Sequence, residues 1–216
     1  ASPFASNESL GALKRLVDAL GGGEIVYRSP RAEDEVPLKG FPTLVRRRDL
    51  SPNAGGADRL GMKRVGDDEA QGGLEGVASH DDIIIVLGDG LLDQSGDFGA
   101  NASLFVYMGT HGSDATSRAD IVLPTTSHAE MEGTFTNYEG RVQRFWPSLD
   151  APGMARPAWL VLSALAAELG RGSLAKTAAE AFAALGAEVP AFSGITYEDI
   201  GTRGAVVNES VSLTGD

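Results

Sequence analysis

The stretch "DDIIIVLGDG", residues 81–90, decides the fold class of this chain. Five consecutive apolar residues, most of them β-branched, run from Ile83 to Leu87 and are followed by Gly88. A short apolar run that ends in a glycine is typical of a strand buried on both faces, as in a parallel sheet. We therefore predict a parallel sheet that other elements cover on both faces.

The segments around this strand alternate between helices and strands. Apolar residues between Leu10 and Leu20 recur with a period of about 3.6 residues, which predicts a helix capped by Ser6 or Asn7. Further strands are predicted at residues 24–28, 103–109 and 119–124, and further helices at residues 157–169 and 175–185. This order predicts an α/β fold with a doubly wound, mostly parallel sheet flanked by helices.

The remaining segments give weaker signals. Short helices are predicted at residues 58–62 and 67–79, and a weak crossover segment at residues 91–101. Residues 29–56 hold four prolines and no clear period, so they form either an excursion with its own role or a disordered segment. Within it, Arg46–Arg48 fit a solvated basic loop or a docking patch. The last thirty residues are rich in turn formers, and we expect them to be peripheral.

The composition excludes several classes of partner and site. The chain has 216 residues, a net charge of −12 and no cysteine. A surface this acidic repels phosphate backbones, and the longest apolar run is too short to span a bilayer, so we expect no nucleic-acid partner and no direct membrane insertion. Without cysteine the chain cannot ligate an iron–sulfur cluster or a zinc–thiolate site. The lack of cysteine fits a cytosolic setting, and no signal peptide is visible. Because the sequence begins at Ala1 almost inside a helix start, we expect a fragment of a longer protein.

Two glycines follow the apolar strand, at the place where α/β sheets bind ligands. Gly88 and Gly90 lie just past its carboxyl end, where backbone amides and helix N-termini converge on a crevice. The third glycine of a dinucleotide-binding fingerprint is missing. Structural turn glycines are therefore the favoured interpretation, and a phosphate cradle is the alternative.

A second polar loop follows the next predicted strand. Thr110, His111, Ser113 and Thr116 offer hydroxyl and imidazole groups beside flexible glycines. Such a loop can hold an anion or a nucleotide, or it can be stitched together by its own side chains. The sequence leaves both interpretations open.

Three further residues, His128, Glu130 and Glu132, suggest a metal site at first sight. Their two-residue spacing points alternately on a strand and does not converge on a helix, so the metal signal is weak. We predict instead that Glu130 or Glu132 meets a backbone amide or Arg141. No cysteine and no serine elbow supports a nucleophilic triad.

A longer pattern carries a resemblance to a known family. The stretch "RADIVLPTTSHAEMEGTFTNYEGRVQ", residues 118–143, resembles a signature of the molybdopterin oxidoreductase superfamily. The matching residues are Ala119, Asp120, Leu123, Pro124, Glu130, Gly133, Thr134, Asn137, Glu139, Gly140, Arg141 and Gln143. The segment "SPFASNESLGALKRLVDALGG" is similar to that family's strand end, Asn-Glu helix start and Leu-rich helix, and "ARPAWLVLSALAAELG" is similar to its closing helix. The resemblance therefore covers about residues 1–28 and 58–170. Within the stretch, "ADIVLP" is expected to be a buried strand and "EGTFTNYEGRVQ" a polar turn region held by Glu139 and Arg141.

Two details resemble one member of the superfamily, the large iron–sulfur subunit of NADH–quinone oxidoreductase, respiratory complex I. They are "YMGTHGSDATSRADIVLP", residues 107–124, and "RDLSPNAGGADRLGM", residues 48–62. Catalytic members of the superfamily also end in a β-barrel domain, whereas the stretch after Gly170 is short and partly helical. If the natural end lies near Asp216, this difference favours the complex I interpretation.

This resemblance implies a non-catalytic structural domain on the peripheral arm of complex I. It implies no catalytic residue, metal or cofactor in this fragment, with iron–sulfur clusters held by an N-terminal part of the parent subunit. The implied partners are other peripheral-arm subunits, at the cytoplasmic face of the plasma membrane. The implied division is an α/β domain at residues 1–170, including the excursion at 29–56, and a helical and turn-rich extension at residues 171–216.

Two alternatives stay open. In a molybdenum enzyme such as a formate dehydrogenase, the fragment would help to bind molybdopterin guanine dinucleotide. The residues that would do so, or that would line a vestigial crevice in complex I, are Gly88, Gly90, Thr110, His111 and Asp120. The other alternative is a free-standing nucleotide-binding module.

Overall fold

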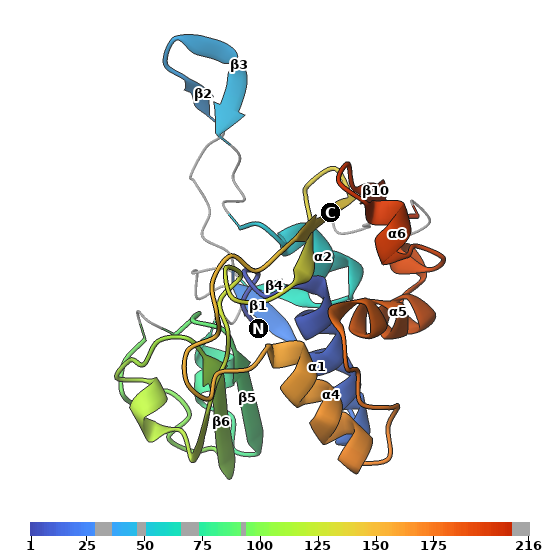
Figure 1. The fold of residues 1–216 in the computed structure, drawn as a ribbon. Coiled ribbons are helices and arrows are strands. Elements are labelled where there is room, and N and C mark those ends of the chain that lie inside the picture. Colours follow the sequence, from blue (N-terminus) through green and yellow to red (C-terminus); the bar gives the residue numbers. More distant parts are fainter. Residues whose placement is uncertain (29–35, 47–50, 66–73, 92–93, 209–216) are drawn as a thin grey trace.

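The chain is described by a computed structural model, which covers residues 1–28, 36–46, 51–65, 74–91 and 94–208. Two parallel sheets form its framework. Strands β5 (Ile83–Leu87), β6 (Leu104–Gly109) and β7 (Ile121–Pro124) lie side by side in that order and run parallel. Strands β1 (Val26–Arg28) and β4 (Lys63–Val65) form a second parallel pair. Helices flank these sheets (Figure 1), which confirms the predicted α/β fold class.

Alternation along β5 and β6 divides the apolar residues between two hydrophobic clusters. Ile84 and Phe105 belong to the smaller cluster, whereas Leu87 and Met108 belong to the larger one. This follows from the two-residue period of a strand, which sends successive side chains to opposite faces. The prediction that β5 is buried on both faces holds only in part, because Ile83 at its start is 40% exposed.

Strand β7 departs from the sequence expectation. The pattern predicts a buried strand at "ADIVLP", but Ile121 and Val122 are 44% and 57% exposed. The reason is its position in the order β5-β6-β7, where it forms an edge of the sheet. An edge strand pairs on one side only, so its apolar residues are not enclosed by neighbours.

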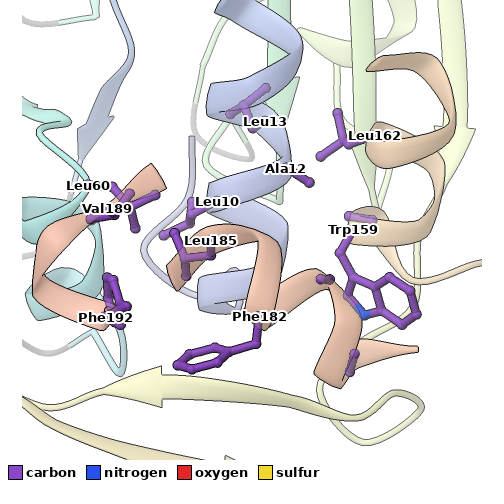
Figure 2. Close-up of a cluster of buried hydrophobic side chains, with 14 of the residues drawn as sticks. Leu10, Ala12, Leu13, Leu60, Trp159, Leu162, Phe182, Leu185, Val189 and Phe192 are labelled. Atoms are coloured by element: carbon purple, nitrogen blue, oxygen red, sulfur yellow. The ribbon is translucent and has the colours of Figure 1, made fainter. Parts of the chain in front are cut away.

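The larger cluster is built around the first helix. Helix α1 (Asn7–Ala19) begins where predicted, and the Ser6 side chain accepts a hydrogen bond from the Ser9 amide. Helices α4 (Ala158–Glu168) and α5 (Ala178–Glu188) pack against α1. Figure 2 shows Leu10 and Leu13 of α1 beside Leu162, Phe182 and Leu185 from the two other helices.

The stretch expected to be a polar turn region is a β-hairpin. Strands β8 (Gly133–Thr136) and β9 (Arg141–Phe145) pair antiparallel, and β10 (Ala205–Val206) extends the sheet beside β9. The side chain of Asn137, and not Glu139 with Arg141, holds the turn. Its Oδ1 accepts hydrogen bonds from the amides of Glu139 (3.0 Å) and Arg141 (2.8 Å). Thr134 and Thr136 resemble loop residues in the sequence, because their buried hydrogen-bond partners lie far away along the chain.

The two short helices predicted after residue 56 overlap the observed helices only in part. Helix α2 (Ala54–Arg59) starts before the predicted residues 58–62, and β4 follows it unpredicted. The start of α2 is not apparent from the sequence because it contains Gly56. The fold requires glycine there, because an added Cβ would lie 2.2 Å from the Asn7 side chain. Helix α3 (Glu75–Ala78) covers the end of the predicted range 67–79, whose beginning lies outside the described residues.

The proline-rich excursion contains regular structure. Strands β2 (Val36–Leu38) and β3 (Phe41–Arg46) form an antiparallel hairpin that projects from the rest of the chain (Figure 1). The positions of Arg47 and Arg48 lie outside the described residues, so the interpretation of the basic stretch stays a prediction.

The C-terminal part contributes to the core instead of lying at the periphery. The 3-10 helix η3 (Pro190–Phe192) and helix α6 (Tyr197–Ile200) follow α5. Another 3-10 helix, η2 (Thr116–Arg118), lies earlier in the chain, between β6 and β7. Phe192 and Ile200 are fully buried in the cluster around α1. The division of the chain at residue 170 stays a prediction. Within the described part of the chain, no helix is both long and apolar enough to cross a membrane.

Candidate functional site

A crevice lies at the carboxyl ends of the parallel strands. It has a volume of about 540 Å³, and its walls come from segments that follow β5, β6 and β7 together with the residues before α1. Four of the five predicted cofactor-binding residues line it, namely Gly88, Gly90, Thr110 and His111. Parallel strands bring these residues together because their carboxyl ends share one edge of the sheet.

The carboxylate of Asp89 organises the polar groups at this edge. It accepts hydrogen bonds from the backbone amides of Thr110 (2.9 Å) and His111 (3.2 Å). The Tyr107 hydroxyl donates to it at 2.8 Å, the Thr110 hydroxyl also donates to it, and His111 Nδ1 lies 2.9 Å from Oδ2. The loop after β6 is therefore tied to the loop after β5 by one side chain.

Asp89 remains ionised at neutral pH. Burial alone would raise its pKa, but the hydrogen bonds from Thr110 and His111 outweigh this and lower the pKa to about 2. Asp89 therefore contributes a negative charge to the crevice, which Arg28 also lines. Sequence reasoning misses Asp89, although its position between Gly88 and Gly90 is a usable signal.

These donors fit a bound phosphate poorly. In a phosphate cradle the backbone amides after a strand point at the anion. Here the amides of Thr110 and His111 point at Asp89, so a side-chain anion takes that place. Gly88 has φ +87°, and a Cβ there would meet the Ser2 Cβ at 2.5 Å. Gly88 thus serves a tight turn, in line with the favoured interpretation of the sequence.

One wall of the crevice does offer an unpaired polar group. Thr126 lines the crevice and is 6% exposed, and its hydroxyl has no hydrogen-bond partner among the described residues. A buried hydroxyl without a partner costs free energy unless a ligand or water supplies one. This unpaired hydroxyl favours a ligand in the crevice.

The fifth predicted residue, Asp120, lies at the other edge of the sheet. Its carboxylate accepts a hydrogen bond from the amide of Phe105 (2.8 Å), near the start of β6. The crevice is at the end of β6, so Asp120 does not belong to it. The Ala-Asp-x-x-Leu-Pro pattern places Asp120 before a strand, and parallel pairing carries that position to the amino edge.

The residues considered for a metal site do not form one. Glu130 accepts a hydrogen bond from the Ser127 amide (2.8 Å), as predicted. Glu132 pairs with Arg144 and not with Arg141. Across the described ranges, no group of three or more acidic or histidine side chains is placed to hold a metal ion.

A buried polar cluster joins α1 to the antiparallel sheet. The Glu8 carboxylate accepts hydrogen bonds from the Thr134 amide (2.9 Å), the Thr134 hydroxyl (2.7 Å) and the Tyr197 hydroxyl (2.8 Å). Glu8 is 0% exposed, and this burial raises its pKa despite the hydrogen bonds. We call Glu8, Thr134 and Tyr197 the Glu8 cluster.

Neighbouring amides extend the same connection. Asn7 Nδ2 donates to the hydroxyls of Thr134 and Thr136, each at 3.0 Å. Asn53 Oδ1 accepts a hydrogen bond from the Thr136 amide (2.7 Å), which ties α2 to β8. Sequence reasoning assigns Asn7 a role as a helix cap only. The Asn-Glu pair and the Gly-Thr-x-x-Asn pattern are recognisable in the sequence, but nothing local shows that they meet.

The comparison with known families agrees with this arrangement. The profile of the molybdopterin oxidoreductase family matches residues 55–168, which is more than half of the chain. The chain belongs to the molybdopterin oxidoreductase family. The matched range includes Asp89, Thr110 and the β8–β9 hairpin.

Relatives of this molybdopterin oxidoreductase domain include proteins of two classes. One is the alpha subunit of F420-dependent formate dehydrogenase 2 of Methanococcus maripaludis, 38% identical over 102 residues, which are 46% of this chain and 15% of the relative. Another is the mitochondrial 78 kDa subunit of NADH-ubiquinone oxidoreductase. The Candida albicans protein is 43% identical over 60 residues (28% of this chain, 8% of the relative), and the Neurospora crassa protein 43% over 68 residues (32% and 9%). The matches therefore span a small part of each relative.

Proposed function

We propose that the chain is a non-catalytic structural domain of the large iron–sulfur subunit of an NADH–quinone oxidoreductase. The observation that carries the proposal is the Asp89 carboxylate, which takes the backbone amides that a cofactor phosphate would need. The resemblance of residues 48–62 and 107–124 to that subunit supports it. So do the matches to the 78 kDa subunits of two fungi.

The charge of Asp89 also supports a non-catalytic role. A pterin dinucleotide carries phosphates, and a phosphate held by the amides of Thr110 and His111 would lie beside the ionised Asp89. Like charges at close range in a partly desolvated site repel each other. Displacing Asp89 would also leave its carboxylate without the hydrogen bonds that keep its pKa low. Asp89 therefore opposes an anion at the amides of Thr110 and His111.

The Glu8 cluster supports a structural role for the family signature. Thr134 belongs to the Gly-Thr-x-x-Asn pattern, and its amide and hydroxyl both serve Glu8. Its side chain is fully buried, away from any surface where a substrate could bind. The signature here holds α1 on the sheet.

In this proposal, the domain sits on the peripheral arm and contacts neighbouring subunits there. Electrons from NADH would pass to quinone through iron–sulfur clusters held by other domains of the parent subunit. The domain would lie at the cytoplasmic face of the plasma membrane. Division into an α/β domain (residues 1–170) and an extension (171–216) belongs to the same proposal.

A second function is favoured by a specific observation, the unpaired hydroxyl of Thr126. In a formate dehydrogenase-like enzyme, Thr126, Gly90 and the Thr110 loop would contact a molybdopterin guanine dinucleotide. That group would supply the redox centre. Asp89 would then have to turn away or accept hydrogen bonds from hydroxyl or amino groups of the ligand.

Purification of the full-length parent protein from its own cells distinguishes the two functions. We expect it to copurify with an NADH-oxidising complex and to contain iron but no molybdenum by elemental analysis. Oxidative release should yield no fluorescent pterin. Molybdenum and pterin at about one equivalent or more per chain would contradict the structural proposal and support the second function. A separately purified formate dehydrogenase serves as the positive control.

A further inference from the structure

The β2–β3 hairpin, residues 36–46, projects from the rest of the chain (Figure 1). Every residue from Pro37 to Val45 is exposed to solvent. A hairpin of two strands is marginally stable in water unless a third strand or a helix packs against it. Among the described residues, β2 and β3 pair only with each other. The hairpin therefore lacks the packing that such a structure needs, and we call it the β2–β3 arm.

The side chains that the β2–β3 arm exposes are mostly apolar. Leu38 and Phe41 pair across the turn and are 47% and 64% exposed. Leu44 and Val45 are consecutive in β3 and are 54% and 39% exposed, so neither face of this strand is covered. A group of exposed apolar side chains on a folded protein marks a site of interaction with another protein or with a membrane.

The charges of the β2–β3 arm are positive, whereas the chain as a whole is acidic. Lys39 lies in the turn and is the only charged residue from Val36 to Val45, and Arg46 ends β3. The net charge of the whole chain is −12. A chain this acidic is repelled by an anionic membrane and by a second copy of itself. Charge therefore favours a different protein, with a carboxylate near the tip, as the partner of the arm.

We propose that the β2–β3 arm docks into an apolar groove of a neighbouring protein subunit, in which a carboxylate faces Lys39. Phe41 is the anchor of this contact, because a few large side chains, aromatic ones above all, supply most of the binding energy of an interface. A groove fits the arm better than a flat surface does, since both faces of β3 are uncovered. The opposite charges fix the position of the tip along the groove. This inference rests on the proposed function for the presence of a neighbouring subunit.

Photo-cross-linking in the assembled complex tests the contact directly. The full-length parent protein is produced in its own cells with p-benzoylphenylalanine in place of Phe41, and the assembly is purified and irradiated. We expect one other polypeptide to be cross-linked, at a peptide with apolar residues and a carboxylate. The exposed His80, replaced in the same way, is the matched control. Lys39→Glu should lower the cross-link yield at position 41 about fivefold or more, and Lys39→Arg should leave it unchanged.

A second variant separates docking from folding. The double substitution Phe41→Ser and Leu44→Ser removes two of the exposed apolar groups. In the isolated 216-residue chain it should shift the melting temperature by less than about 2 °C, because exposed side chains contribute little to folding. In the assembly, gel filtration after dilution should show about tenfold weaker retention of the chain, because truncation of an anchor weakens an interface by at least that much.

Several results would overturn the proposal. They are equal cross-linking from positions 41 and 80, cross-linking to lipid, cross-linking to a second copy of the chain, and unchanged retention of the double variant. Failure of the proposed function gives a different result. The purified assembly would then not oxidise NADH, while the cross-link from position 41 would still show whether the β2–β3 arm docks on another subunit.

Discussion

Two carboxylates in this molecule receive several hydrogen bonds each, yet their environments shift their pKa values in opposite directions. Glu8 lies in the core at 0% exposure, whereas the side chain of Asp89 is 26% exposed at the edge of a crevice. Burial dominates at Glu8 and raises its pKa, while hydrogen bonds dominate at Asp89 and lower it. The number of donors alone therefore does not decide the charge state of a carboxylate.

The two carboxylates also connect different parts of the fold. Glu8 reaches Thr134 and Tyr197, which are 126 and 189 residues away in the sequence. Asp89 connects loops that are close in sequence, as its separations of 21 and 22 residues from Thr110 and His111 show. We therefore expect Glu8 to govern global stability and Asp89 to govern the local shape of the crevice.

The largest effect is expected from Glu8→Ala. The substitution leaves the Thr134 amide and the hydroxyls of Thr134 and Tyr197 buried without an acceptor, so it should cost about 3–5 kcal/mol of unfolding free energy. Urea denaturation measures the loss. Glu8→Gln keeps the shape and one acceptor oxygen, and it should cost less than half as much. Equal stability of Glu8→Ala and the wild type would refute the assigned role.

The second-largest effect is expected in the pH dependence of stability, to which Glu8 and Asp89 contribute with opposite signs. Because the folded pKa of Glu8 is raised above 4.5, the folded state binds its proton more tightly, and Glu8 makes stability fall as pH rises through and above this value. Asp89 does the opposite, since its pKa is lowered from 3.8 to about 2 and its contribution is lost as pH falls through that window. In Glu8→Gln the unfolding free energy, measured between about pH 3 and pH 8, should therefore decline less with rising pH than it does in the wild type. An unchanged profile in this variant would contradict the assignment.

A smaller effect on stability, but a new binding property, is expected from Asp89→Ala. The loss should be about 1–2 kcal/mol, because the pair is partly exposed to solvent. The freed amides of Thr110 and His111 should then donate hydrogen bonds to an anion, so millimolar phosphate should raise the melting temperature of the variant but not of the wild type. Asp97→Ala, at an exposed position after β5, is the matched control. Phosphate stabilisation of the wild type would show that Asp89 does not close the crevice.

The smallest effect is expected from Thr126→Val. The buried hydroxyl has no partner among the described residues, so replacing it with a methyl group should change stability by less than about 1 kcal/mol, in the stabilising direction. Thermal unfolding of the chain measures this. In the full-length protein the same variant should leave NADH oxidation unchanged, whereas loss of bound pterin in Thr126→Val would favour the molybdenum-enzyme function.

The sequence predicts the parts of the fold that depend on local patterns. The period of α1, the apolar run of β5 and the Pro-initiated α4 all lie close to their expected positions. Four of the five residues predicted to bind a cofactor line one crevice, since each follows a predicted parallel strand. Whether they bind a cofactor stays a prediction.

The elements that sequence reasoning misses have a common physical cause. Thr134 and Thr136 look like loop residues until Glu8 and Asn7 supply their hydrogen bonds, and those partners lie 126 and 129 residues away. Asp120 carries a family pattern, but only the direction of β7 shows that it faces the opposite edge from the crevice. Local sequence patterns contain neither piece of information.

The separation between Glu8 and Tyr197 has a consequence for biosynthesis. The amino end of α1 emerges from the ribosome before the rest of the core, but its carboxylate receives its last buried donor only when Tyr197 has been made. Until then the buried carboxyl group of Glu8 lacks one of its hydrogen-bond donors, so we expect the core around α1 to close late. A ribosome that pauses between β9 and α6 would therefore hold a nascent chain whose first helix is formed but not yet docked.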